Sequence, residues 1–200
     1  MREIIDRLVD WSAAGKDFAL ATVVRTDGSA PSPAGSAMAV AADGDVIGGM
    51  SAGYVESAIV ESARRVLESG DSSMLRFGAH DSTLAIGPAC GGSVEILVKH
   101  SRRVGGHLRT LQHALRCGRA AALVTVIDGP VSDVGTQCAW DSGKMPSPAI
   151  PEPVLDALND GLRSAHVVVE TERGEGTVFV HCFPPRADVA VSLDRCVGQA

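Results

Sequence analysis

The sequence predicts an α+β fold with a mixed or antiparallel sheet, flanking helices and β-hairpins. Apolar residues recur at helical spacing in several segments, and short runs rich in β-branched residues indicate buried strands. Asp43-Gly44 separates two apolar runs, which is typical of a tight hairpin turn. Strands and helices do not alternate regularly, so a parallel βαβ sheet is not expected.

Taken in order, the patterns predict each element. Helices are expected at residues 1–14, 54–69, 104–116 and 152–165. Strands are expected at residues 18–25, 37–42, 45–47, 74–78, 93–99, 119–128, 166–171 and 177–183. Gly15 and Gly70 follow helical patterns, where they favour a C-terminal cap. Residues 143–151 are expected to form an exposed loop, and we find no internal repeat in the sequence.

These elements suggest a division into a first module at residues 1–100, a connecting α/β region at 101–185 packed on it, and a tail at 186–200. The composition is that of a soluble globular protein, with 45% hydrophobic and 21% charged residues. A net charge of -6 argues against nucleic acid as a partner. No apolar run approaches the roughly 20 residues that span a bilayer.

The N-terminal segment and the cysteine pattern bear on the cellular location of the protein. The N-terminus is an amphipathic helix start and not a signal peptide, so a cytoplasmic protein is expected. The five cysteines are widely spaced, odd in number and without a Cys-x-x-Cys pair. This pattern predicts reduced thiols in preference to a disulfide framework or a zinc site.

The most informative stretch runs from Gly48 to Glu56. Glycines let a ligand approach the backbone closely, and the first amides of a helix point outward without internal partners. Together they favour an anion, phosphate above all. In the alternative interpretation Ser51 is the N-cap of the helix and the glycines serve only the turn.

Two further segments of small residues precede or follow strands. Residues 26–36 carry Gly28 and Ser29 in a proline-containing loop that is suited to cradle a ligand. Cys90 is followed by two glycines directly before the strand at 93–99, where backbone amides can stabilise a thiolate. The alternative for Cys90 is a free cysteine packed as a small hydrophobe.

These segments together resemble the XdhC/CoxI family of accessory factors for molybdenum hydroxylases. The resemblance rests on Gly28-Ser29-Ala30-Pro31 after a strand, Gly35 with Met38, Gly48-x-x-Ser51-x-Gly53-x-Val55-Glu56, and Cys90-Gly91-Gly92-x-Val94-Glu95, in family order. It covers residues 18–99 specifically and 100–185 more weakly. The chain departs from the family pattern at Ser32, Ala52 and Tyr54, and no glycine loop of the family's C-terminal Rossmann domain follows residue 185.

The resemblance implies a maturation factor that binds molybdenum cofactor (molybdopterin) and helps deliver it to an apo hydroxylase of the xanthine or CO dehydrogenase type. The implied cofactor-binding residues are Gly28, Ser29, Gly48, Gly49, Ser51, Gly53, Cys90, Gly91 and Gly92. Cys90 would face the molybdenum, and a homodimer is expected. Ser32 stands where the family has a basic residue that could meet a phosphate.

Two other functions stay open. The chain could be a non-catalytic interaction subunit with a vestigial cofactor pocket, pairing with a separate Rossmann partner. It could also be a thiol enzyme that uses Cys90 with His80, although the sequence does not show that these two residues meet. A non-enzymatic maturation role is the favoured of the three.

Overall fold

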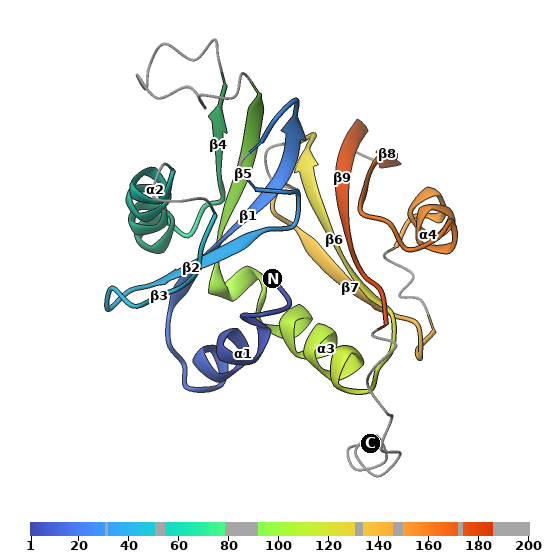
Figure 1. Cartoon of the computed structure of the whole chain (residues 1–200), viewed down its shortest axis with the longest axis horizontal. Helices are drawn as coiled ribbons and strands as arrows, with labels where there is room; N and C mark the ends of the chain where they lie inside the picture. Colours follow the sequence, from blue (N-terminus) through green and yellow to red (C-terminus); the bar gives the residue numbers. More distant parts are fainter. Residues whose placement is uncertain are drawn as a thin grey trace. The chain divides into compact units, whose positions relative to one another are not determined.

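The computed structural model describes residues 1–30, 32–50, 55–78, 92–130, 134–145, 150–171 and 174–185. The chain divides into two compact units, Met1–Gly105 and Gly106–Ala200. Each unit contains one antiparallel sheet with helices beside it (Figure 1). The predicted α+β class with hairpins is therefore confirmed.

Unit 1 is built on a five-stranded sheet in the order β3-β2-β1-β5-β4. Its elements are α1 (Ile5–Ala13), β1 (Phe18–Asp27), β2 (Ala37–Ala41), β3 (Val46–Gly48), α2 (Glu56–Ser69), β4 (Ser73–Phe77), β5 (Ser93–His100) and the short 3-10 helix η1 (Ser101–Arg103). All neighbouring strands are antiparallel. The boundaries agree closely with the expected elements.

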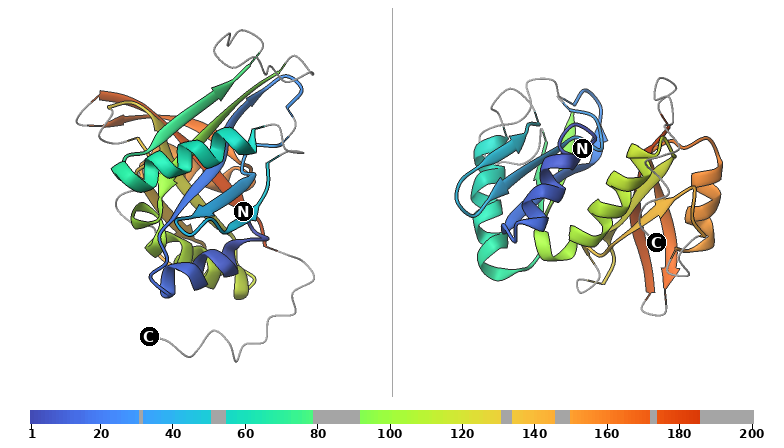
Figure 2. Two further views of the ribbon diagram at one scale, coloured as in Figure 1. Left: turned by 90° about the vertical axis from the view of Figure 1, so that its left-hand side faces the viewer. Right: turned by 90° about the horizontal axis from the view of Figure 1, so that it is seen from below.

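Helix α2 covers one face of this sheet, as Figure 2 shows. Its buried residues recur at helical spacing, so one stripe of the helix faces the strands. The stripe packs against alternate residues of β1 and β5, and the core contains Ile59, Ala63, Val66, Ala21, Ile96 and Val98. Gly70 ends the helix in the left-handed conformation, with φ of 79°.

Unit 2 has a four-stranded sheet in the order β7-β6-β9-β8. Its elements are α3 (Gly105–Arg116, beginning at the unit boundary), β6 (Ala121–Asp128), β7 (Gln137–Asp141), α4 (Glu152–Asn159), β8 (Ala165–Thr171) and β9 (Gly174–Phe183). Val154 and Leu158 of α4 pack on one face of the sheet, against Val178 and Val180.

The two units repeat one topology, although no internal repeat is found in the sequence. In each, a helix is followed by a hairpin, a second helix and a second hairpin, and β2-β1-β5-β4 matches β7-β6-β9-β8 in sheet order. Local details match as well. The Gly35 amide donates to the Val23 carbonyl at 2.8 Å, and the Gly135 amide donates to the Val126 carbonyl at 2.9 Å.

Three expectations for unit 2 were wrong. Strand β7 was not expected, α4 ends at Asn159 and not at residue 165, and β9 begins at Gly174 within a predicted turn. The expected tail at 186–200 lies outside the described residues. The expectation of reduced thiols is wrong for Cys117, which is disulfide-bonded, whereas Cys138 and Cys182 are free cysteines among the described residues.

Among the described helices, none has both the length and the apolar character needed to cross a membrane. The described residues also contain no group of three His, Cys, Asp or Glu side chains that could hold a metal ion.

Candidate functional site

The segments singled out in the sequence all connect to one end of the unit 1 sheet. Antiparallel pairing places the end of β1, the start of β2, the end of β3, the end of β4 and the start of β5 toward this end (Figure 1). Asp27 pairs with Ser93, and Phe77 pairs with Val94. The segments at 28–36, 49–55 and 78–92 therefore leave from and return to the same end of the sheet, where α2 also begins.

Gly92 lies directly against the loop that follows β1. A Cβ built at Gly92 would come 2.5 Å from the carbonyl oxygens of both Asp27 and Ser29. Real Cβ atoms do not approach backbone oxygens this closely, so only glycine fits at this crossing. The structure thus brings Gly92 and Ser29 together, from segments that are more than sixty residues apart in the sequence.

Ser32 ties the same loop to the segment after β3. Its hydroxyl donates a hydrogen bond to the Met50 carbonyl, and Ser32 is only 9% exposed. Sequence reasoning treated Ser32 as a lost basic residue and missed this structural contact. The sequence gives no signal for this hydrogen bond, because most serines in polar loops are exposed to solvent.

The two adjacent glycines after β3 have different surroundings. Gly48 has φ of 78°, and a Cβ there would come 2.4 Å from the Ala37 carbonyl oxygen. The fold itself therefore requires glycine at Gly48. Among the described residues, a Cβ at Gly49 would meet the Glu56 carboxylate oxygen Oε1, at an ordinary 3.7 Å, and no backbone crossing with them requires glycine there.

The start of α2 bears on the alternative role of Ser51. The helix begins at Glu56 with Val55 at the N-cap position, and among the described residues no side chain caps it. Ser51 lies outside the described residues, so its role as an N-cap stays a prediction. The only acidic residue of its first turn is Glu56.

An ion-pair ladder crosses three strands close to this end of the sheet. Glu95 Oε2 lies 3.7 Å from Arg25 Nη1, and Glu95 Oε1 lies 3.1 Å from Arg76 Nε. Cross-strand register places all three residues in one row. Two guanidinium groups on one carboxylate leave a net positive charge there, and both arginines are largely exposed.

The remaining predicted residues lie outside the described part of the chain, namely Ser51, Gly53, Cys90 and Gly91. The same holds for Ala52 and Tyr54 and for the proposed partner of Cys90 in a thiol enzyme, His80. Gly28 is described and follows β1 directly, with φ of 65°. The described site residues are therefore Gly28, Ser29, Gly48, Gly49 and Gly92.

Two comparisons with known proteins found a match to this chain. A crystal structure described as a xanthine dehydrogenase from Bacillus halodurans superposes with a TM-score of 0.61 at 17% identity. The match covers 91% of this chain and 53% of that chain, so this chain spans about half of its length, and at this identity the likeness shows the fold alone. No curated protein matches the sequence. The model of the XdhC and CoxI family matches residues 11–78 of this chain.

Proposed function

We propose that this chain is an accessory factor that binds molybdenum cofactor and helps deliver it to a hydroxylase of the xanthine or CO dehydrogenase type. The family match over residues 11–78 supports a maturation role. The proposed cofactor site rests on one observation, which is that the three small-residue segments connect to the same end of the unit 1 sheet. Glycine at position 49, which no backbone crossing with the described residues requires, supports an approaching ligand.

The residues at this end of the sheet fit an anionic cofactor in outline. The phosphate would lie against the backbone of Gly48 and Gly49 and the first amides of α2. Ser29 would donate a hydrogen bond to the phosphate or the pterin edge. Cys90, with Gly91 beside it, would face the molybdenum, and Ser51 and Gly53 would complete the phosphate loop. When bound, the cofactor supplies the metal centre that the recipient hydroxylase uses.

Glu56 limits how tightly a phosphate can bind here. Its carboxylate lies beside Gly49 and belongs to the first turn of α2, where a negative charge is stabilised by the helix dipole. A bound phosphate would compete with this carboxylate for the same amides. Limited affinity suits a carrier, which must release its cofactor.

The decisive variant is Gly49→Ala. Because the added methyl group meets an ordinary contact among the described residues, thermal unfolding should be unchanged. A ligand seated on the Gly49 backbone would instead be displaced, and a loss of about 1.4 kcal/mol corresponds to a tenfold weaker dissociation constant. We expect roughly this loss in anaerobic titrations with molybdenum cofactor.

The control is Gly106→Ala in α3, at a glycine whose Cβ would meet no described atom within 4 Å. This variant lies in unit 2 and should bind cofactor as the wild type does. Equal affinity of Gly49→Ala and wild type would contradict the phosphate placement. Absence of any binding under anaerobic, reducing conditions would contradict the carrier function itself.

Cys90→Ser tests the metal contact separately. Serine is a harder ligand than a thiolate, so a sulfur contact to molybdenum would be weakened while phosphate binding remains. The expected result is weaker binding of the intact cofactor and unchanged binding of the metal-free pterin phosphate. Equal loss for both ligands would show that Cys90 does not act through the metal.

The second candidate is an interaction subunit with a vestigial pocket, and the geometry of Ser32 favours it. The position where the family has a basic residue is nearly buried, and its hydroxyl is already bound to Met50. It cannot hold a phosphate as a cation would. This function predicts a stable complex with a hydroxylase or a separate Rossmann protein in the absence of cofactor, detectable as a mass increase in light scattering.

A further inference from the structure

The disulfide at Cys117 is an unexpected feature of unit 2, because the cysteine pattern predicts reduced thiols. Of the five cysteines in the chain, Cys138 and Cys182 are free. The second sulfur of the disulfide therefore belongs to Cys90 or to Cys196, both of which lie outside the described residues.

Cys117 is held in place by the turn that ends α3. It directly follows the last residue of the helix, and its amide donates to the His113 carbonyl at 3.0 Å. The Arg119 amide, two positions further on, donates to the Ala114 carbonyl at 2.9 Å. Cys117 is only 6% exposed. One half of the disulfide is therefore anchored in a hydrogen-bonded, buried part of unit 2.

The chain leaves β9 close to this turn. Ala121 at the start of β6 pairs with Phe183 at the end of β9. Cys117 is four positions before Ala121, so its Cα lies within roughly 20 Å of the Cα of Phe183. Cys196 is thirteen positions after Phe183, and thirteen extended residues span roughly 40 Å. The chain is thus long enough to bring Cys196 within the roughly 6 Å between Cα atoms that a disulfide requires.

Cys90 is the less suitable partner. It belongs to unit 1, whereas Cys117 and Cys196 both belong to unit 2. Cys90 is also two positions before Gly92, whose backbone lies so close to the loop after β1 that no Cβ fits there. A bond to Cys90 would have to link the two units from a segment that is tied to the unit 1 sheet, whereas a bond to Cys196 stays within one unit.

We propose that Cys117 is bonded to Cys196, and that this disulfide is a redox-sensitive tether for the segment at residues 186–200. The bond closes a loop that contains all four strands of the unit 2 sheet. A cross-link across a loop of this length restricts the unfolded chain strongly, so it stabilises unit 2. Reduction removes this restriction and frees the segment, while the hydrogen bonds of the sheet remain.

Thiol–disulfide exchange with an external dithiol opens the tether. Because Cys117 is buried, the attacking thiolate is expected to reach the sulfur of Cys196. A bond forms between that sulfur and the dithiol, the Cys117–Cys196 bond breaks, and Cys117 leaves as a thiolate. The second thiol of the dithiol then displaces Cys196 and closes the oxidised reagent. Two protons pass from the dithiol, through solvent, to the two cysteines.

The surroundings of Cys117 suit this exchange. His113 Nε2 lies 3.9 Å from Cys117 Sγ, one helical turn earlier in the chain. A ring nitrogen at this position can exchange a hydrogen bond with the sulfur when the disulfide is open.

Peptide mapping of the oxidised full chain identifies the partner. After free thiols are blocked with N-ethylmaleimide, trypsin places Cys117 in the peptide 117–119, Cys196 in 196–200 and Cys90 in 77–99. We expect peptide 117–119 to be linked to 196–200 and to be released by dithiothreitol. A link to 77–99, or an unlinked peptide 117–119, would overturn the proposal.

Counting free thiols in the denatured, oxidised chain gives an independent answer. Five cysteines less the bonded pair leave three free thiols in the wild type. Cys90→Ser should leave two, because the disulfide stays intact, and Cys196→Ser should leave four, because Cys117 loses its partner. The opposite result for these two variants would assign the bond to Cys90 and overturn the proposal. Cys138→Ser is the matched control, since it removes a free cysteine of unit 2 and should keep the disulfide.

Thermal unfolding with and without dithiothreitol tests the tether. Reduction should lower the melting temperature of the wild type, Cys90→Ser and Cys138→Ser by roughly 5 °C or more. It should leave the melting temperature of Cys196→Ser unchanged. A wild type that melts at the same temperature in both conditions would contradict a stabilising tether, as would an equal decrease in Cys196→Ser. None of these measurements involves cofactor, so their outcome is independent of the proposed function.

Discussion

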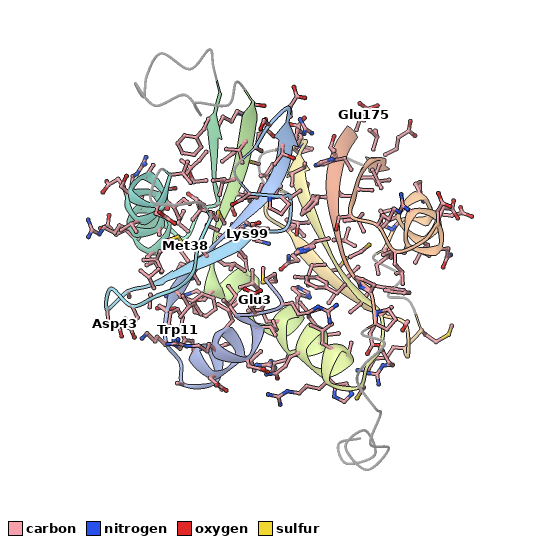
Figure 3. All side chains as sticks on the ribbon, viewed as in Figure 1. Glu3, Trp11, Met38, Asp43, Lys99 and Glu175 are labelled. Atoms are coloured by element: carbon pink, nitrogen blue, oxygen red, sulfur yellow. The ribbon has the colours of Figure 1, made fainter. Side chains whose placement is uncertain are left out.

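Replacing Lys99 by methionine should make the protein more stable. Lys99 lies on β5 within the unit 1 sheet and is 1% exposed (Figure 3). Burial, with a smaller contribution from the positive charge of Arg103, lowers the pKa of Lys99 to about 7 from its ordinary value of 10.5. The folded state therefore disfavours the charged amine, which the unfolded chain keeps up to much higher pH.

The size of the effect follows from the two pKa values. Each unit of pKa difference corresponds to about 1.4 kcal/mol, so a difference between 10.5 and about 7 costs the folded state about 4 kcal/mol near pH 7. Methionine fills a similar volume without a charge. Allowing for relaxation around the amine, we expect Lys99→Met to raise the free energy of unfolding by roughly 2–4 kcal/mol at pH 7.

The sign of the pH dependence provides a sharper test. Between pH 7 and pH 10.5 the unfolded chain binds a proton at Lys99 that the folded chain does not. Wild-type stability should therefore rise with pH across this window, by up to about 1.4 kcal/mol per unit relative to Lys99→Met. The advantage of the variant should shrink accordingly as the pH rises.

Urea unfolding followed by tryptophan fluorescence measures the free energy of unfolding of the wild type and of Lys99→Met at each pH. The chain has two tryptophans, Trp11 in unit 1 and Trp140 in unit 2. A Trp140→Phe background leaves Trp11, which contacts Phe18 with ring centroids 5.8 Å apart, as a reporter of unit 1. Each transition can then be assigned to one unit, which matters because a chain of two units need not unfold in one step.

Lys16→Met is the control with the opposite sign. Hydrogen bonds from Lys16 to Asp43 and Asp45 raise the pKa of Lys16, so its removal should lower stability. A Lys99→Met protein that is less stable than wild type at pH 7 would refute the reasoning. The reasoning would also be refuted if the free energy of unfolding of the wild type and of Lys99→Met changed equally with pH between pH 7 and pH 10.

Three further predictions concern other titrating groups. Burial is the main cause that lowers the pKa of His100, whose ring nitrogen accepts a hydrogen bond from the Arg102 amide. The free energy of unfolding should therefore fall as the pH drops below about 6.5. The His100→Asn variant should lose this pH dependence in thermal unfolding. Burial raises the pKa of Asp141, but hydrogen bonds from Arg119 at 2.8 Å and from a turn amide outweigh it and lower the pKa. Arg119→Met leaves the Asp141 carboxylate without this partner and should cost roughly 1–3 kcal/mol in urea unfolding at pH 7, and in the wild type this contribution should vanish as the pH falls through the lowered pKa. Burial raises the pKa of Cys182 to about 11, so its alkylation at pH 8 should be roughly a hundredfold slower in the folded protein than in urea.

Much of the fold could be predicted because its elements carry strong local signals. The stripe on α2, the Asp43-Gly44 turn and the β-branched strands determine their structures within a few residues of sequence. Strand β7 could not be found in this way. Its sequence from Gln137 to Asp141 is short and only partly buried, and it becomes a strand by pairing with β6. Tertiary pairing of this kind leaves little trace in local propensity.

The candidate site was predictable in part for the same reason. Glycines signal special backbone at Gly48 and Gly92, and both positions have contacts that exclude a side chain. The contact of Ser32 with Met50 and the burial of Lys99 depend on which segments meet, which the sequence pattern does not contain. A lysine in an alternating strand ordinarily points to solvent.

The repeated topology helps to separate glycines that serve the fold from glycines that serve a ligand. In unit 1 a Cβ at Gly92 would strike the Asp27 carbonyl oxygen at 2.5 Å, and in unit 2 a Cβ at Gly176 would come 3.0 Å from the Asp128 carbonyl oxygen. In both units a glycine next to or within the last strand faces the end of the first strand. This crossing therefore belongs to the architecture, since it recurs where none of the XdhC/CoxI motif segments is present.

Gly92 accordingly carries less weight as a cofactor residue than its place in the motif implies. The same holds for Gly48, whose positive φ and contact with Ala37 already account for it. Gly49 has no positive φ and no blocking backbone contact with a described residue. Gly49→Ala is therefore the substitution among the described site residues that tests the proposed cofactor site with the least expected disturbance of the sheet beneath it.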